Sequence, residues 1–391
     1  MPDAIRRRPL LVLLLLLAGL PACSDDAPGQ DATVPDAAPC GPGDATPLSQ
    51  GRVLVATEQY GSGGAVSVID LDTLEPTLNV ALTTDDVTLR WFDHRIWVIN
   101  RYGGDNIMIL ADRDYHLQKQ FSVRPAPNVP CNPHDLLFLS TCRAVLSCYA
   151  QPAVYLLDPT APVGQERVGE IDLSSLADDD GLPEVSHLAQ VGSRVFATVQ
   201  RLARADGWVP VGTSYVAILD PEAQTLTGTI ALESENPGGP LVRIPGTADL
   251  LVAGNGAWDG QHAGLERIHT DTDEASLALS ADALGGIPTA FTVDASGCGF
   301  ALITAPESYD TGVVRYCLEG AVQACVPLGA LEVSDVALTD DGRLLVTDRA
   351  HASPGVRIYD SETCEEETTA PISTGFAPGF TDPLLLIPPA D

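Results

Sequence analysis

The chain has 391 residues, of which 45% are hydrophobic and 19% charged, a balance that supports a large buried core and excludes a wholly disordered protein. Asp and Glu number 53 against 21 Lys and Arg, which gives a formal net charge of −32 at pH 7. Because such a surface repels phosphate backbones, we expect no nucleic-acid partner.

The N-terminal sequence is typical of a targeting segment. Three arginines precede an apolar run from Leu10 to Leu20, which is too short to span a membrane. The run ends in Leu20-Pro21-Ala22-Cys23, which resembles the lipobox of bacterial lipoproteins, where the cysteine sulfur receives a diacylglycerol. We therefore predict a signal peptide over residues 1–22 and a lipid on Cys23. An ordinary signal peptide, which would leave Cys23 as a free thiol, is the alternative.

The segment after Cys23 predicts a tether and a cellular location. Residues 23–50 repeat Asp, Ala, Pro and Gly and contain almost no large apolar side chain, so they are expected to form a flexible linker. Ser24 resembles the residue that directs lipoproteins to the outer membrane. We expect a protein anchored in the bacterial cell envelope, at the outer membrane, with the face of that membrane left open.

From Arg52 onward one structural unit repeats. Its first half is a short apolar and β-branched strand that occurs seven times, over residues 53–57, 96–100, 144–148, 195–199, 250–254, 300–304 and 344–348. Its second half is an alternating strand that ends near residues 70, 111, 158, 220, 269, 317 and 360. The spacing suits four-stranded propeller blades, with an insertion over residues 201–215 in the fourth unit.

These repeats predict an all-β fold, a seven-bladed β-propeller over residues 51–391. The first unit begins at its second strand, and Phe380 to Ile387 is a strand without a partner at the C-terminus. We predict that this strand pairs in the first blade and closes the ring, because closure removes an exposed sheet edge.

The repeat resembles that of YVTN-type β-propeller proteins. Pro133-His134-Asp135 matches the start of their repeat, Val98-Ile99-Asn100 its middle loosely, and Val66-Ser67-Val68-Ile69-Asp70 its end closely. The resemblance implies a surface or periplasmic propeller, many of which have no known activity, and the fold does not determine the function.

The cysteines predict disulfide bonds. The chain has nine, and eight remain once Cys23 carries the lipid, an even number in an exported protein. Cys131 and Cys148 lie at the same end of two neighbouring strands and are predicted to pair. Cys317 and Cys325 flank a hairpin and are the second predicted pair, although Cys298 competes for Cys317. The partners of Cys40, Cys142 and Cys364 stay unassigned. A metal site is the rival interpretation, but the sequence holds no Cys-x-x-Cys.

Candidate ligand-binding residues lie where the innermost strands begin, because those loops converge on the channel mouth of a propeller. The candidates are Asp86, Arg101, His134, Asp135, His187 and Asp335. Polar residues at these positions also commonly hydrogen-bond the neighbouring blade, which is the structural alternative for each of them.

Two classes of function fit the sequence. A non-catalytic binding or scaffold propeller, monomeric, is favoured because no nucleophile elbow, zinc-protease motif, P-loop or dinucleotide fingerprint occurs. Its partner would be an envelope protein, a polysaccharide or a small polar ligand, and no cofactor or metal is assigned. The alternative is an envelope enzyme, a lactonase-like hydrolase or a lyase, in which His134, His187 and the mouth aspartates act as acid, base or metal ligands.

Overall fold

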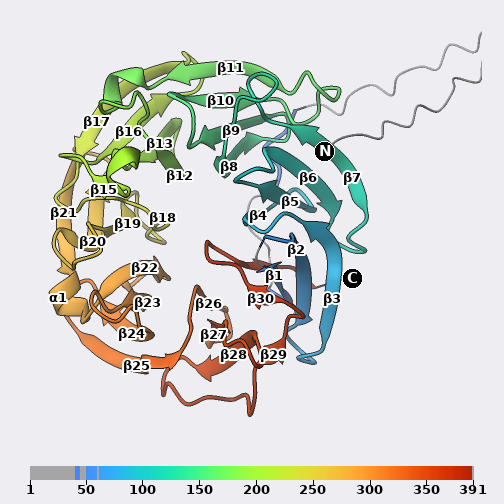
Figure 1. The fold of residues 1–391 in the computed structure, drawn as a ribbon, viewed down its shortest axis with the longest axis vertical. Coiled ribbons are helices and arrows are strands. Elements are labelled where there is room, and N and C mark those ends of the chain that lie inside the picture. The colour runs from blue at the N-terminus through green and yellow to red at the C-terminus, as the bar shows by residue number, and fades with distance from the viewer. Residues whose placement is uncertain (1–39, 45–49, 60, 390–391) are drawn as a thin grey trace, which may run out of the picture. The chain divides into compact units, whose positions relative to one another are not determined.

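A computed structural model describes residues 40–44, 50–59 and 61–389. Seven antiparallel sheets follow one another around a ring (Figure 1). Six of them have four strands, and the first has five, two of which come from the C-terminus. The protein is therefore a seven-bladed β-propeller, as the repeat predicted. Among the described residues, no helix is both long and apolar enough to cross a membrane. The predicted signal peptide and Cys23 lie outside the described residues.

The first four blades are built from strands that follow one another in the chain, apart from the closing strands of the first blade and the β14–β15 insertion in the fourth. The first contains β1 (Arg52–Glu58), β2 (Gly64–Asp70), β3 (Pro76–Thr83), β30 (Ala377–Pro378) and β31 (Leu384–Ile387). The second contains β4 (Val87–Phe92), β5 (Arg95–Asn100), β6 (Asn106–Ala111) and β7 (Leu117–Ser122). The third contains β8 (Pro133–Ser140), β9 (Arg143–Cys148), β10 (Ala153–Leu157) and β11 (Arg167–Asp172). The fourth contains β12 (Val185–Val191), β13 (Arg194–Val199), β16 (Tyr215–Asp220) and β17 (Thr225–Ala231).

The remaining blades follow the same order. The fifth contains β18 (Leu241–Arg243), β19 (Leu250–Asn255), β20 (Ala263–His269) and β21 (Glu274–Ser280). The sixth contains β22 (Ile287–Phe291), β23 (Cys298–Thr304), β24 (Thr311–Cys317) and β25 (Val322–Leu331). The seventh contains β26 (Val336–Leu338), β27 (Arg343–Asp348), β28 (Gly355–Asp360) and β29 (Ile372–Ser373).

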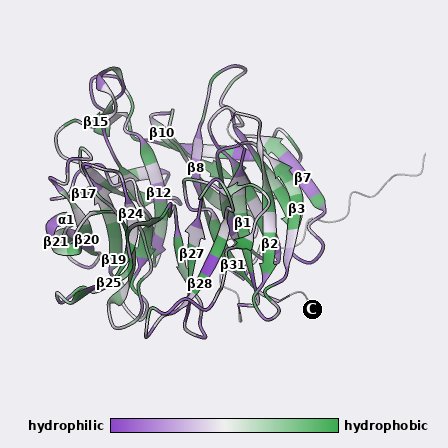
Figure 2. Cartoon of the chain, turned by 60° about the horizontal axis from the view of Figure 1, so that its bottom comes forward, coloured by the Kyte–Doolittle hydropathy of each residue, from purple (hydrophilic) through white to green (hydrophobic). Residues whose placement is uncertain are grey.

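Short elements decorate the ring. They are the 3-10 turns Ser174–Leu176 and Arg204–Asp206, helix α1 (Ala281–Leu284), and the hairpin of β14 (Leu202–Ala203) and β15 (Val209–Pro210). That hairpin is the predicted insertion of the fourth blade, and β15 stands out at one end of the ring in Figure 2.

The second and third strands of each blade form the core. The second strand β1 is buried along its whole length, and the corresponding strands of other blades are buried at nearly every position. Apolar side chains of neighbouring blades pack into shared clusters, for example Leu146 of the third blade with Ile107 of the second. Because a strand covered on both faces needs apolar residues on both, its sequence is a continuous apolar run, which is the signal that the repeat supplied.

The ring closes through the C-terminus. β31 pairs antiparallel with β1, from Leu384 opposite Val55 to Ile387 opposite Arg52. β30 pairs with the other end of β1, at Thr57 and Glu58. The predicted closure of the first blade by the C-terminal strand is confirmed.

Four disulfides join the eight described cysteines. Cys131–Cys148 is confirmed. The predicted Cys317–Cys325 pair is wrong, because Cys317 lies directly opposite Cys298 in the register of β23 and β24 and is bonded to it. Cys325 is instead bonded to Cys364 of the seventh blade.

The fourth disulfide, Cys40–Cys142, changes the boundary of the folded unit. We expected residues up to 50 to belong to a flexible tether, whereas the compact unit begins at Cys40. Gly41 accepts a backbone hydrogen bond from Thr141 at 2.9 Å, and Asp44 accepts one from Asp93 at 2.8 Å. These residues therefore lie against the hairpins that join the first and second strands of the third and second blades.

Candidate functional site

The two ends of the ring differ in which loops they carry. Each innermost strand is reached from the outermost strand of the preceding blade, so all innermost strands begin at one end. Because neighbouring strands are antiparallel, the loops between the second and third strands lie at that same end. We call it the entry face. The opposite end carries the hairpins between first and second strands, such as Thr141–Cys142, and we call it the exit face.

A repeated local structure positions the residues at the start of the innermost strands. In three blades a backbone amide there donates to a buried hydroxyl on the second strand of the same blade. The amides belong to Asp135, His187 and Asp335 and the hydroxyls to Ser147, Thr198 and Thr347, at 2.9 Å in each pair. The pairing register shifts at this point in the third and fourth blades. Such an irregularity redirects a side chain, here toward the ring axis.

Two of these side chains connect neighbouring blades. Asp135 accepts from the amide of Leu188, in the next blade, at 2.8 Å. Asp335 accepts from the amide of Leu384, again in the next blade, at 3.0 Å. Both carboxyl groups are nearly inaccessible to solvent. Buried carboxyl oxygens that accept backbone amides stabilise the arrangement of the strands. For Asp135 and Asp335 the structural alternative named above is therefore the observed arrangement.

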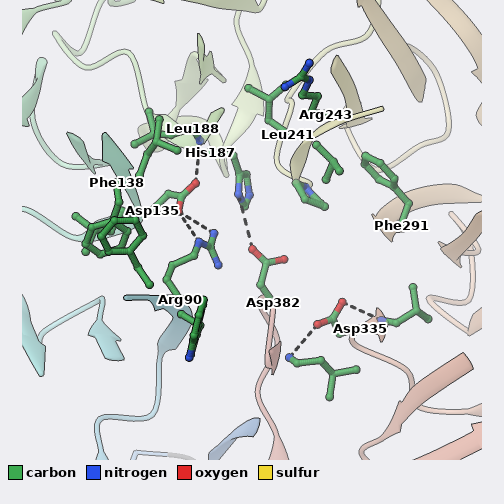
Figure 3. A pocket seen from close by; sticks show the side chains of 18 residues that line it. Arg90, Asp135, Phe138, His187, Leu188, Leu241, Arg243, Phe291, Asp335 and Asp382 are labelled. Atoms are coloured by element: carbon green, nitrogen blue, oxygen red, sulfur yellow. Dashed lines mark hydrogen bonds and ion pairs between the residues drawn. The ribbon is translucent and has the colours of Figure 1, made fainter. Parts of the chain in front are cut away.

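A cavity of about 460 Å³ lies along the axis and is lined from several blades (Figure 3). Arg90 forms an ion pair with Asp135 at 2.8 Å. Asp382, from the loop between β30 and β31, points across the cavity toward His187, whose Nδ1 lies 3.7 Å from its carboxylate. His187 also contacts the carbonyl oxygen of Gly238 through Nε2 at 3.1 Å. The first and fourth blades thus meet across the axis.

The charge state of the cavity depends on Asp335. Burial raises the pKa of Asp335 to about 8, with a further contribution from the neighbouring carboxylate of Asp382. Asp335 is therefore largely protonated at neutral pH. Burial by itself would lower the pKa of Arg90, but the surrounding carboxylates, Asp135 foremost, outweigh it and raise that pKa. Arg90 is therefore a permanent cation of the cavity, which Arg243 also lines.

A second cluster lies at the mouth. His134 stacks on Tyr149, with ring centroids 4.0 Å apart and planes 7° from parallel. Its Nε2 lies 2.8 Å from Nη2 of Arg101, and its Nδ1 lies 3.1 Å from the hydroxyl of Ser186. Arg101 is also 3.4 Å from Asp86. Burial, followed by the charge of Arg101, holds the pKa of His134 well below its usual range, so this imidazole is neutral at pH 7.

The six predicted site residues therefore form two groups. Asp86, Arg101 and His134 lie together in the mouth cluster. The other three, Asp135, His187 and Asp335, line the axial cavity, where His134 is absent from the lining.

The sequence analysis missed three charged residues that line the cavity, Arg90, Arg243 and Asp382. A signal existed for Arg90, because it is the one charged residue of the strand Val87–Phe92, whose other residues are apolar apart from Thr88. Asp382 lies in an irregular loop, and no pattern places it opposite His187. Within the described part of the chain, no three His, Cys, Asp or Glu side chains are placed to hold a metal ion together.

Comparisons with known proteins support the fold. No protein-family model matches the chain, and no curated protein matches it in sequence. Three solved structures that resemble it are a quinoprotein alcohol dehydrogenase-like protein from Bacteroides thetaiotaomicron, a dihydro-heme d1 dehydrogenase and a streptogramin B lyase. Their TM-scores are 0.57, 0.54 and 0.51.

Sequence identity to these three structures is 10%, 12% and 13%, over 84%, 85% and 78% of this chain and 77%, 75% and 93% of theirs, in the same order. At such identity the likeness concerns the fold alone. The resemblance to YVTN-type repeats stays a prediction.

Proposed function

We propose that this protein is a lipid-anchored propeller of the bacterial cell envelope that acts by non-catalytic binding through its entry face. The observation that carries the proposal is how the ionisable groups near the axis are used. Asp135 and Asp335 accept amides of neighbouring blades, and His134 lies between Arg101, Ser186 and Tyr149. Groups held in this way stabilise the ring and are poorly placed to exchange protons with a substrate.

The anchor follows from the lipobox resemblance. Cys23 is the one cysteine that none of the four disulfides includes. Residues 40–44, which follow Cys23 in the chain, are bound to the exit face. A lipid on Cys23 would therefore attach the propeller to a membrane surface. Metabolic labelling with an alkyne fatty acid should mark the wild-type chain and leave the Cys23→Ala variant unmarked. Equal labelling of both would contradict the anchor.

The binding proposal is tested by capture from envelope extracts. Trp258 and Tyr309 are exposed on entry-face loops, and replacing both with Asn keeps their left-handed backbone accessible. We expect the Trp258→Asn/Tyr309→Asn variant to lose at least ~10-fold of the captured partner, the scale of an interface hot spot. The matched control is Leu117→Thr/Val168→Thr, which alters two exposed apolar residues on outer strands. Equal capture by all three proteins would refute binding through the entry face.

An enzyme is the second candidate, favoured by the axial cavity. His187 and Asp382 line one hollow of about 460 Å³, an arrangement that offers a proton donor and a proton acceptor to a small ligand. The sequence-based version of this hypothesis used His134 and His187 together, but only His187 lines the cavity. A native mass spectrum with metal analysis tests it. A stoichiometric small molecule or ion that is lost in His187→Ala would support the enzyme, and an empty wild-type protein would count against it.

A further inference from the structure

The exposed aromatic side chains of the described residues all lie on the entry face. They are Tyr102, Trp208, Trp258, Tyr309 and Phe380, with 39% to 77% of their surface exposed. Four of them come from loops between second and third strands, in four different blades, and Phe380 comes from the loop that leads into β31. The exposed aliphatic residues, such as Leu117 and Leu277, lie mainly on outer strands instead. Exposed aromatic rings gathered on one face mark an interaction surface.

The backbone at these loops supports the same conclusion. Trp208, Trp258 and Tyr309 have φ values of 65°, 64° and 61°, in the left-handed region that bulky residues rarely adopt. Such conformations carry a cost in stability and concentrate at binding sites. Folding alone gives no reason to expose three large rings on strained loops.

A hollow of about 710 Å³ lies on this face between the fifth and sixth blades. Its lining includes the carboxylates of Glu233, Asp259 and Asp282, and contains no Lys or Arg. The loops that carry Trp258 and Tyr309 border it, because Asp259 follows Trp258 and Pro306 belongs to the Tyr309 loop. The described carboxylates are not grouped for a metal ion. A spread set of carboxylates suits an extended organic cation better than a single metal.

The arginines of the entry face do not neutralise this hollow. Each of the five arginines that the structure describes on this face has an intramolecular contact elsewhere. Arg101 pairs with Asp86, Arg124 with Asp105, Arg204 with Glu184 and Arg349 with Glu58, while Arg201 donates to the carbonyl of Thr213. Glu233, Asp259 and Asp282 form no ion pair within the described residues. The hollow therefore presents negative charge that a partner can neutralise.

On the same face, two arginine side chains are each bound by an aromatic ring together with a carboxylate. The guanidinium of Arg349 lies 3.4 Å from the ring centroid of Phe380 and 2.7 Å from the carboxylate of Glu58. Arg204 lies 5.3 Å from the ring of Trp208 and 3.0 Å from Glu184. An aromatic ring together with a carboxylate is thus used twice to bind a guanidinium. Trp258 and Tyr309 beside the acidic hollow repeat these elements, and no described cation lies over either ring.

We propose that the hollow between the fifth and sixth blades, with Trp258 and Tyr309, binds Arg or Lys side chains of a basic polypeptide segment. The inference rests on the proposed function and specifies its partner. A cationic side chain enters the hollow toward Asp259 and Asp282, and its neighbours in the segment lie against the two rings. Charge complementarity favours a basic polypeptide over a neutral glycan. The three carboxylates attract a cation, but they give no preference for a glycan over any other neutral polar ligand.

The test measures binding of a fluorescein-labelled octa-arginine peptide to the full chain, purified in detergent, by fluorescence anisotropy. We expect Asp259→Asn/Asp282→Asn to weaken binding at least ~10-fold, because two charge pairs that the bound peptide would cover and shield from water are lost. The matched control is Asp271→Asn/Glu274→Gln, which removes the same charge from the other end of the fifth blade. We expect that control to change the affinity less than ~2-fold, the scale of exposed pairs.

Two results would overturn the inference. Equal weakening by both double variants would show that the peptide responds to overall charge and not to the hollow. Binding of a neutral oligosaccharide such as maltoheptaose, lost in Trp258→Asn/Tyr309→Asn and unaffected by Asp259→Asn/Asp282→Asn, would assign the face to glycans. In either case, the proposed function would still hold if capture from envelope extracts depended on Trp258 and Tyr309. If capture did not depend on these two residues, both the proposed function and this inference would be refuted.

Discussion

For single residues near the axis, the sequence predicts where the residue lies but not what its side chain contacts. Counting back from the second strands placed Asp135, His187 and Asp335 near the starts of innermost strands, because blade geometry fixes where such a strand begins, and the three residues line the axial cavity. What each side chain contacts depends on the next blade, and for His187 on the loop holding Asp382, nearly two hundred residues further along the chain. A local sequence pattern carries no information about such distant partners. The contacts of Asp135, His187 and Asp335 could therefore be identified only in the structure.

Asp335 should make stability depend on pH. Its folded-state pKa is raised from 3.8 to about 8, so the native state keeps a proton that the unfolded chain releases. Its contribution to the free energy of unfolding is fully present below about pH 4 and is lost as the pH rises toward 8. The loss is on the order of a few kcal/mol. Urea unfolding across this range should therefore show a flatter profile for Asp335→Asn than for the wild type.

Asp382→Asn provides the control for that titration. Removing its charge takes away the second cause of the raised pKa of Asp335, so the pH profile should become shallower without disappearing. A wild-type profile as flat as that of Asp335→Asn would show that this carboxyl does not titrate as described.

At the level of elements, the strands were predictable and the disulfides only in part. A second strand buried on both faces must be apolar throughout, so each blade left a clear run in the sequence. Cysteine pairing depends instead on register and on contacts between blades. Cys298 and Cys317 are directly opposite across β23 and β24, which leaves Cys325 to bond with Cys364 of the next blade. Neither fact follows from spacing along the chain.

The Cys325–Cys364 bond should stabilise the junction of the sixth and seventh blades. It closes a separation of 39 residues, and loops of this length correspond to about 2–4 kcal/mol. Cys325→Ser/Cys364→Ser should lower the free energy of unfolding by that amount in denaturant titrations. The bond Cys298–Cys317 spans 19 residues inside one blade, so Cys298→Ser/Cys317→Ser should cost somewhat less. A larger loss from the latter pair would argue against this order.

For the whole molecule, the decisive feature is closure of the ring by both chain ends. β31 covers the edge of β1 that would otherwise be exposed, and Ile387 is completely buried there. The sequence predicted this pairing because an unmatched strand remained at each end of the repeat. It did not predict the loop between β30 and β31, which carries Asp382 to the axis, because a loop of this kind has no periodicity.

Removing residues 384–391 should open the ring. The loss of β31 takes away the buried Ile387 and exposes the edge of β1, so we expect a destabilisation of at least ~3 kcal/mol together with aggregation. Thermal unfolding followed by light scattering measures both. Removing residues 390–391 alone is the control and should leave both measurements unchanged. A monomeric, equally stable chain lacking 384–391 would mean that closure depends on other contacts.

The disulfide between Cys40 and Cys142 also has a mechanical consequence. Cys142 lies in the hairpin between β8 and β9, on the exit face, so Cys40 is attached to the ring there. A pulling force applied to the chain at Cys40 therefore acts on the third blade directly, through a covalent bond, and leaves the entry-face loops of Trp258 and Tyr309 outside its path.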